Sequence, residues 1–214
     1  MRVIALPVKS LSDGKSRLAP LLTTIERGAL SLAMFEDVLD ATLALDGWST
    51  WVVSTDESVR EIGLRRGAEV RAEERPSLAG AVQQVEEEAL ARDVEALAIL
   101  HADTPLVTAA SLRGALRTLG PVVIAPAADE RGTNLLLRRP PDAIPSRFGS
   151  DSFRRHLEAA AERDLPIAVV DHEELAFDVD EPADILTVLE ARRPGRTLEV
   201  CRDLDLAGRL AART

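Results

Sequence analysis

The stretch Ala96–Leu106, with the sequence ALAILHADTPL, joins five apolar residues directly to a polar turn. A short apolar run of this kind indicates a β-strand over Ala96–Leu100. Asp103 follows at the carboxyl end of that strand, and Pro105 stiffens the turn. Because open α/β sheets bind their ligands beyond the carboxyl ends of the strands, Asp103 is well placed to contact a ligand. The other interpretation is that Asp103 caps a following helix, where aspartate is common.

Similar segments occur along the chain and alternate with patterns that are typical of helices. The predicted strands are Val3–Val8, Thr50–Ser54, Ala96–Leu100, Val122–Ala125, Asn134–Arg138 and Ile167–Val170. Helices are predicted from a capping box at Thr23 to about Leu45, and over Glu57–Arg66, Ser77–Arg92, Ser111–Leu119, Asp151–Glu162 and Pro182–Ala191. This alternation predicts an α/β fold with a mostly parallel sheet.

The composition is that of one globular domain without a membrane segment. A chain of 214 residues, of which 46% are hydrophobic, can bury a sizeable core. No apolar run reaches the roughly 18 residues of a spanning helix, and the N-terminus lacks a secretory signal, so we expect a soluble cytoplasmic protein. A net charge of −10 argues against broad nucleic-acid binding. The single cysteine, Cys201, is interpreted as a partly buried small apolar residue.

A short C-terminal appendage follows the main domain. Pro194 and Gly195 break the last long helix, so we assign residues 1–192 to the main domain and residues 193–214 to the appendage. The appendage has a weak helical pattern and carries no recognisable chemistry. It is compatible with self-association into a homodimer, although no residue pattern requires one.

Basic residues gather in the loop Lys9–Pro20, after the first strand, inside an otherwise acidic chain. The loop matches neither the dinucleotide-binding fingerprint nor the Walker pattern, which excludes a standard P-loop. Lys9, Lys15 and Arg17 can hold phosphate groups, since lysine supplies a mobile charge and arginine two parallel hydrogen bonds. The loop is therefore a candidate triphosphate site, and the alternative is an ordinary solvated basic loop.

A pair of carboxylates, Asp178 and Asp180, lies in the segment Phe177–Pro182. In extended backbone, residues at i and i+2 point to the same face, so both carboxylates share a face while Val179 points into the core. Two like charges side by side are unfavourable unless a cation offsets them, and carboxylate oxygens suit Mg²⁺. The alternative is that Asp180 caps a helix that begins at Pro182.

The histidines offer no further chemistry on sequence grounds. His101, His156 and His172 lack metal-ligand spacing, and no serine or cysteine lies in a nucleophile-elbow pattern. A covalent mechanism therefore has no candidate nucleophile.

Taken together, these motifs resemble the 2-phospho-L-lactate and phosphoenolpyruvate guanylyltransferases of coenzyme F-420 biosynthesis, over nearly the whole chain up to about Arg192. The resemblance rests on five segments in this order: Val8-Lys9 with Lys15–Ala19, Asp103–Leu106, Gly132–Asn134, Arg147–Phe153 and Asp178–Asp184. Each segment is a weak motif alone, whereas their order and spacing make the set specific.

The resemblance implies a three-layer α/β/α nucleotide-diphospho-sugar transferase fold, GT-A-like and Rossmann-like. It also implies an Mg²⁺-dependent transfer of GMP from GTP to a phosphorylated three-carbon acid, with release of pyrophosphate. By position, the implied Mg²⁺ ligands are Asp103, Asp178 and Asp180, and the implied catalytic residues are Lys15, Arg17 and Asp103. The implied nucleotide-binding residues are Leu6, Pro7, Val8, Lys9, Lys15, Arg17, Leu78, Ala79 and Ala102. The implied acceptor-binding residues are Thr133, Gly149 and Ser152.

Two segments depart from the family pattern. The family often shows Gly-Asp-Leu-Pro where this chain has Ala102-Asp103-Thr104-Pro105, and Leu-Asn where it has Leu78-Ala79. The second departure weakens the implied recognition of the base. Phosphoenolpyruvate is the acceptor that we predict first, with 2-phospho-L-lactate or a phosphoglycerate as alternatives. The other hypotheses are a nucleotidyltransferase acting on molybdopterin or a sugar phosphate, and a catalytically silent nucleotide-binding protein.

Overall fold

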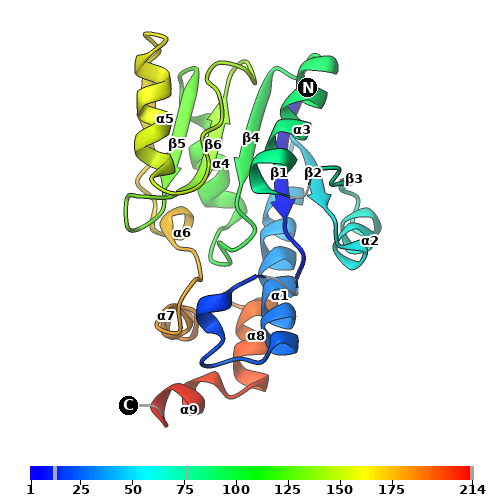
Figure 1. The fold of residues 1–214 in the computed structure, drawn as a ribbon, viewed down its shortest axis with the longest axis vertical. Coiled ribbons are helices and arrows are strands. Elements are labelled where there is room, and N and C mark those ends of the chain that lie inside the picture. Colours follow the sequence, from blue (N-terminus) through cyan, green and yellow to red (C-terminus); the bar gives the residue numbers. More distant parts are fainter. Residues whose placement is uncertain (12–13, 76, 213–214) are drawn as a thin grey trace.

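The computed structural model describes residues 1–11, 14–75 and 77–212, which form a twisted sheet with helices on both sides (Figure 1). Its strands are β1 (Arg2–Val8), β2 (Ser49–Ser54), β3 (Glu69–Ala72), β4 (Ala96–Leu100), β5 (Val122–Pro126), β6 (Thr133–Arg138) and β7 (Ile167–Val169). Their order in the sheet is β3-β2-β1-β4-β6-β5-β7. Neighbouring strands are parallel except that β6 runs antiparallel to β4 and β5, so the prediction of a mostly parallel sheet is confirmed.

One strand is absent from the sequence prediction. β3 contains two charged residues among its four and has no apolar run, so its pattern does not stand out from a loop. It becomes a strand because Trp51 to Ser54 of β2 offer it a parallel partner at the edge of the sheet. Tertiary pairing therefore decides this element, as is usual for short edge strands.

The helices are α1 (Thr24–Leu43), α2 (Glu57–Arg65), α3 (Leu78–Ala91), α4 (Ala109–Arg117), α5 (Ser152–Ala161), α6 (Glu173–Ala176), α7 (Asp184–Ala191), α8 (Arg196–Asp203) and α9 (Leu206–Ala211), with a 3-10 turn, η1, at Ser16–Leu18. The predicted capping box is confirmed, since Thr23 and Glu26 each accept a hydrogen bond from the other's backbone N–H. The predicted start of α7 at Pro182 is wrong by two residues, and α6 has no counterpart among the predicted helices. Within the described part of the chain, no helix has the length and apolar character needed to cross a bilayer.

The core lies in two layers, one on each face of the sheet. Ile4 and Leu6 of β1 pack with Phe35 of α1 in one apolar cluster. Val3 and Ala5 of the same strand pack in a second cluster that includes α3 residues. Alternate side chains of β1 thus enter opposite layers, as the geometry of a strand dictates. Helices cover both faces, which confirms the three-layer α/β/α architecture (Figure 1).

The predicted boundary near residue 192 falls between α7 and α8, and the helices beyond it pack on the rest of the protein. α8 and α9 share an apolar cluster with α1 and α7, in which Cys201 is fully buried. Burial raises the pKa of the Cys201 thiol to about 11. The interpretation of this residue as a small apolar side chain is confirmed, although Cys201 is fully rather than partly buried.

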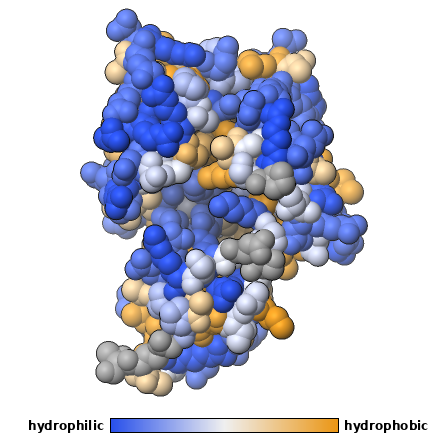
Figure 2. Space-filling model, viewed as in Figure 1, coloured by the Kyte–Doolittle hydropathy of each residue, from blue (hydrophilic) through white to orange (hydrophobic). Residues whose placement is uncertain are grey.

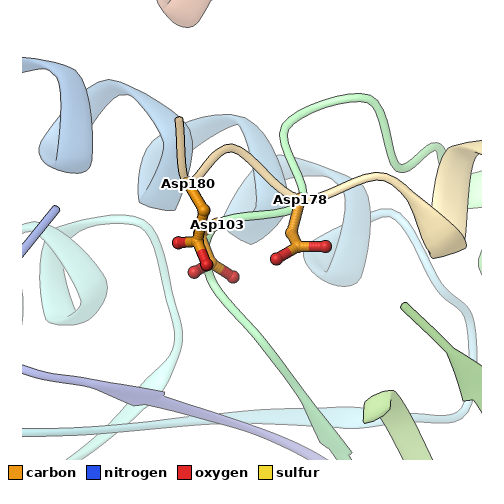
Figure 3. A group of neighbouring side chains, drawn as sticks. All are labelled: Asp103, Asp178 and Asp180. Atoms are coloured by element: carbon orange, nitrogen blue, oxygen red, sulfur yellow. The ribbon is translucent and has the colours of Figure 1, made fainter. Parts of the chain in front are cut away.

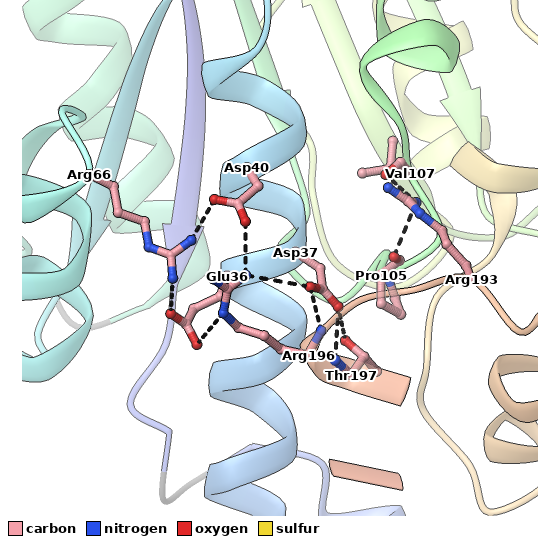
Figure 4. Close-up of polar contacts among 9 residues, drawn as sticks. All are labelled: Glu36, Asp37, Asp40, Arg66, Pro105, Val107, Arg193, Arg196 and Thr197. Atoms are coloured by element: carbon pink, nitrogen blue, oxygen red, sulfur yellow. Dashed lines mark hydrogen bonds and ion pairs between the residues drawn. The ribbon is translucent and has the colours of Figure 1, made fainter. Parts of the chain in front are cut away.

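The first turn of α8 is held by a side chain from α1 (Figure 4). The carboxylate of Asp37 accepts hydrogen bonds from the backbone nitrogens of Arg196 and Thr197, both at 2.9 Å, and from the Thr197 hydroxyl at 2.6 Å. A Cβ atom at Gly195 would lie 2.8 Å from this carboxylate, so a larger residue at this position would displace it. A negative charge at a helix N-terminus is also favoured by the helix dipole.

Candidate functional site

A cleft of about 910 Å³ lies at the edge of the sheet where β1 and β4 end. Because β6 is antiparallel to β4, it begins at this same edge, so Thr133 also lines the cleft. The surface is hollowed between the sheet and the group formed by α7, α8 and α9, and hydrophilic residues border the hollow (Figure 2). The volume falls in the range of small-molecule and cofactor sites.

Three carboxylates meet in this cleft (Figure 3). Asp103 follows β4, whereas Asp178 and Asp180 lie in the segment between α6 and α7, and one oxygen from each lies within 4.8 Å of the others. The backbone nitrogen of Val179 donates to the carbonyl oxygen of Asp103 at 3.0 Å, which joins the two segments. Val179 itself is fully buried, so the predicted alternation of the acidic pair around a core residue is confirmed.

Neither of the two capping interpretations holds. Thr108 caps the helix that follows Asp103, with its hydroxyl accepting from the backbone nitrogen of Ser111. Asp180 does not cap α7 either. Instead, the carboxylate of Asp184, in the first turn of α7, accepts from the backbone nitrogens of Asp180 and Glu181, at 2.8 and 2.7 Å. Asp103 and Asp180 therefore keep their carboxylates directed into the cleft.

Lys15 reaches from the first loop into the carboxylate cluster. Its Nζ lies 2.5 Å from Asp103 Oδ2 and 2.9 Å from Asp180 Oδ1, and its side chain is only 10% exposed. The residue adopts the left-handed region with φ of 55°, just before η1. Burial lowers the pKa of Lys15, but the two carboxylates outweigh burial and the net shift is upward.

The third carboxylate, that of Asp178, is less well stabilised as an anion. Burial and the neighbouring charge of Asp103 raise the pKa of Asp178 to about 6, against an opposing hydrogen bond from Asn134. Among the described residues, the buried Oδ1 of Asp103 has no hydrogen-bond partner. A hard divalent cation would bind the unpartnered Asp103 oxygen and would offset the negative charge of Asp178. These residues therefore fit Mg²⁺.

Most of the other predicted residues line the cleft as well. From the nucleotide set these are Pro7, Val8, Lys9, Lys15, Arg17, Leu78 and Ala102, and from the acceptor set Thr133, Gly149 and Ser152. Two do not line it: the Leu6 side chain is fully buried in the core, and Ala79 is exposed on the first turn of α3. Arg17 is two-thirds exposed at 67% and forms an ion pair with Glu181 at 3.3 Å.

Supporting residues around the carboxylates are not identified by sequence reasoning. Asn134 Nδ2 donates to the carbonyl oxygens of Leu175 and Ala176, both at 3.0 Å, and lies 3.3 Å from Asp178 Oδ1. Arg193 donates to the carbonyl oxygens of Pro105 and Val107, behind the Asp103 turn (Figure 4). Asn134 and Asp184 lie within the motifs quoted above, whereas no pattern marks Arg193.

A family model described as "Guanylyl transferase CofC like" matches residues 1–208. The match covers α1 to α9 nearly completely, including the helices beyond residue 192. The resemblance inferred from the motifs is confirmed.

Relatives with three different names resemble the chain. A phosphoenolpyruvate guanylyltransferase of Sphaerobacter thermophilus is 37% identical, covering 86% of this chain and 90% of its own. A 3-phospho-D-glycerate guanylyltransferase of Colwellia psychrerythraea is 33% identical, with coverage of 85% and 88%. A 2-phospho-L-lactate guanylyltransferase of Methanothermobacter thermautotrophicus is 36% identical, with coverage of 84% and 80%.

Solved structures show the same fold. A nucleotide-diphospho-sugar transferase-type protein of Desulfovibrio desulfuricans superimposes with a TM-score of 0.79 at 18% identity and covers 96% of both chains. At this identity the likeness concerns the fold alone, and it confirms the nucleotide-diphospho-sugar transferase architecture.

Proposed function

We propose, because this chain belongs to the CofC-like guanylyl transferase family, that it transfers GMP from GTP to a phosphorylated three-carbon acid and releases pyrophosphate, as a step of coenzyme F-420 biosynthesis. The observation that carries the proposal is the convergence of Asp103, Asp178, Asp180 and Lys15 in one cleft, although they come from three separate parts of the chain. A triphosphate and an acidic acceptor are both polyanions, and a site of this kind can offset their charges.

The reaction needs little covalent chemistry from the protein. A phosphate oxygen of the acceptor, ionised at neutral pH, attacks the α-phosphorus of GTP; the new P–O bond forms as the bond to the β-phosphate breaks and pyrophosphate departs. No proton has to be removed from this nucleophile, so no general base is required. The contribution of the chain is to place the two reactants in line and to offset their charge.

The charge-bearing residues divide this work. Lys9, Lys15 and Arg17 line one side of the cleft and are suited to the triphosphate. We propose that Asp103, Asp178 and Asp180 hold Mg²⁺, which when bound supplies Lewis-acid neutralisation between the two polyanions. Lys15 is in contact with two of these carboxylates, so it lies where the metal site and the triphosphate site meet.

Phosphoenolpyruvate remains the acceptor that we propose first, because two relatives of that name are 37% identical to this chain. The test mixes the purified protein with GTP and Mg²⁺, adds phosphoenolpyruvate, 2-phospho-L-lactate or 3-phospho-D-glycerate in turn, and follows pyrophosphate release. Pyrophosphate release with ATP in place of GTP measures the selectivity for guanine, and omission of Mg²⁺ measures the metal requirement. Absence of release with all three acids would overturn the proposal.

We propose further that the enzyme acts in the cytoplasm, where GTP is available. Whether two copies associate is a separate prediction, which light scattering coupled to size-exclusion chromatography tests directly.

A further inference from the structure

His156 is a fully buried residue of α5 that connects two sides of the cleft. Its Nδ1 lies 3.1 Å from the hydroxyl oxygen of Thr133, the first residue of β6. Its Nε2 accepts a hydrogen bond of 2.9 Å from the backbone nitrogen of Arg147, in the loop that leads to Gly149. The sequence gives no hint of this role, because His156 has no metal-ligand spacing and lies 23 residues from Thr133.

The contact with Arg147 determines where the imidazole proton lies. A backbone N–H can only donate, so Nε2 must be the unprotonated nitrogen of the ring. A neutral imidazole then carries its proton on Nδ1. An imidazolium would direct a second proton at the Arg147 N–H, and burial, together with the charges of Arg138 and Arg155, lowers the pKa of His156 to about 3. His156 is therefore neutral and donates from Nδ1 to Thr133.

The orientation of the Thr133 hydroxyl follows from this tautomer. Its oxygen accepts the hydrogen bond from His156, so its own proton must point away from the imidazole. Thr133 lines the cleft with only 1% of its surface exposed, and its hydroxyl makes no other hydrogen bond to any residue in the described ranges. The hydroxyl proton thus has no acceptor within the described part of the chain.

We propose that His156 is a positioning residue, which fixes the Thr133 hydroxyl as a hydrogen-bond donor toward an anionic oxygen of the acceptor substrate. The inference rests on the proposed function, because it takes the molecule beside Thr133 to be the phosphorylated acid. The chemical consequence is a preference: one lone pair of the hydroxyl is occupied by His156, and its proton is offered to a carboxylate or phosphate oxygen.

The surroundings of His156 restrict the ring to this orientation. Phe148 packs edge-on against the imidazole, with ring centroids 5.0 Å apart and planes at 76°. The same phenyl ring lies 5.4 Å from His101, next to the turn that carries Asp103. Because both nitrogens of His156 are engaged, a flip of the ring would break both hydrogen bonds, so Nδ1 stays directed at Thr133.

The kinetic test uses Thr133→Val, His156→Phe and the double variant, with GTP and the acceptor varied separately. A hydrogen bond to a charged group contributes about 1.5–3 kcal/mol, so each single change should lower kcat/KM for the acceptor by about 10- to 100-fold. The KM for GTP should stay unchanged. Thr133→Ser, which keeps the hydroxyl, should retain activity close to that of the wild type.

The double variant separates positioning from a general structural effect. If His156 acts through Thr133, the double variant should lose little more than either single variant. If the two single losses in kcat/KM multiply in the double variant, or if His156→Phe raises the KM for GTP, the proposal is overturned. Thr50→Val is the matched control, because Thr50 is a buried strand threonine whose hydroxyl has no partner in the described structure and lies away from the cleft.

A spectroscopic test does not depend on activity. With ¹⁵N-labelled histidine, NMR of the unliganded protein should show the signals of a neutral imidazole with its proton on Nδ1. These signals should not change from about pH 5 to pH 8. Thr133→Val should shift them, and His156→Phe should remove them. A proton on Nε2, or titration in this interval, would refute the role of His156. If the tautomer is found but the wild type releases no pyrophosphate with any acid, the proposed function fails and the hydrogen-bond arrangement stands.

Discussion

Lys15 places its ammonium 2.9 Å from Asp180, although 165 residues separate the two in the chain. The same nitrogen lies 2.5 Å from Asp103. In this state a lysine neutralises two of the three carboxylates that fit a metal ion. A divalent cation that binds to these carboxylates must share them with the Lys15 ammonium or displace it. The net charge of the site therefore depends on whether the ammonium, the divalent cation or both contact the carboxylates.

Replacing Lys15 with Met should therefore strengthen metal binding in the absence of nucleotide. The ammonium competes electrostatically for Asp103 and Asp180, so its removal should lower the Kd for Mn²⁺, used as a probe for Mg²⁺, by about tenfold. The same variant should lose turnover with GTP, because the triphosphate loses a cation. Calorimetry or electron paramagnetic resonance measures the Kd, and an unchanged or weaker affinity would contradict the competition.

Replacing Asp103 or Asp180 with Ala should abolish turnover and leave the fold intact. Each removes a carboxylate that we propose holds Mg²⁺, the cation that offsets the charge of the two polyanions, and we expect kcat to fall by about a hundredfold or more. The Asp180 side chain is 49% exposed, so its loss costs little core packing. Circular dichroism checks the fold, and Asp203→Ala, on the exposed side of α8, is the matched control that should leave kcat unaltered.

The stability of the metal-free protein should depend on pH through Asp178. Its folded-state pKa of about 6 exceeds the ordinary value of 3.8, so the folded state binds this proton more tightly than the unfolded state does. The contribution of Asp178 to stability is then fully present below 3.8 and is lost as pH rises through about 6.

Asp178→Asn removes this titration and keeps an oxygen that can accept from Asn134. In the absence of metal, the variant should melt at a higher temperature than the wild type at pH 8, with the difference shrinking toward pH 4. Thermal melts across this pH series measure the effect. If the wild type is instead more stable than Asp178→Asn at pH 8 without metal, the charged form of Asp178 does not destabilise the fold.

Asp37→Ala should loosen the C-terminal helices from α1. It removes three hydrogen bonds at the start of α8, two from backbone nitrogens, and should lower the free energy of unfolding by about 2–4 kcal/mol. Asp40→Ala is the matched control on the same helix, because Asp40 is half exposed and its ion pairs with Arg66 and Arg196 contribute about 1 kcal/mol or less (Figure 4). Urea unfolding compares the two, and equal losses would argue against the role of Asp37.

Local sequence determined the elements and part of the site. The alternation of apolar runs with helical patterns is a short-range property, and it gave the strands β1, β2 and β4 to within a residue or so. The shared face of Asp178 and Asp180 follows from the two-residue repeat of extended backbone around Val179, which needs no tertiary information. The assignment of Asp103 to the carboxyl end of β4 has the same origin.

The tertiary structure alone decided which distant residues meet and which protonation state they adopt. The antiparallel direction of β6 brings Thr133 to the edge where Asp103 lies, and only the folded loop inserts Lys15 between carboxylates 88 and 165 residues away. The proton on His156 is fixed by a backbone N–H of Arg147, which no side-chain pattern encodes. Spacing along a chain reports contacts within one strand or helix, whereas hydrogen bonds and charge pairs between elements depend on how the sheet is ordered and packed.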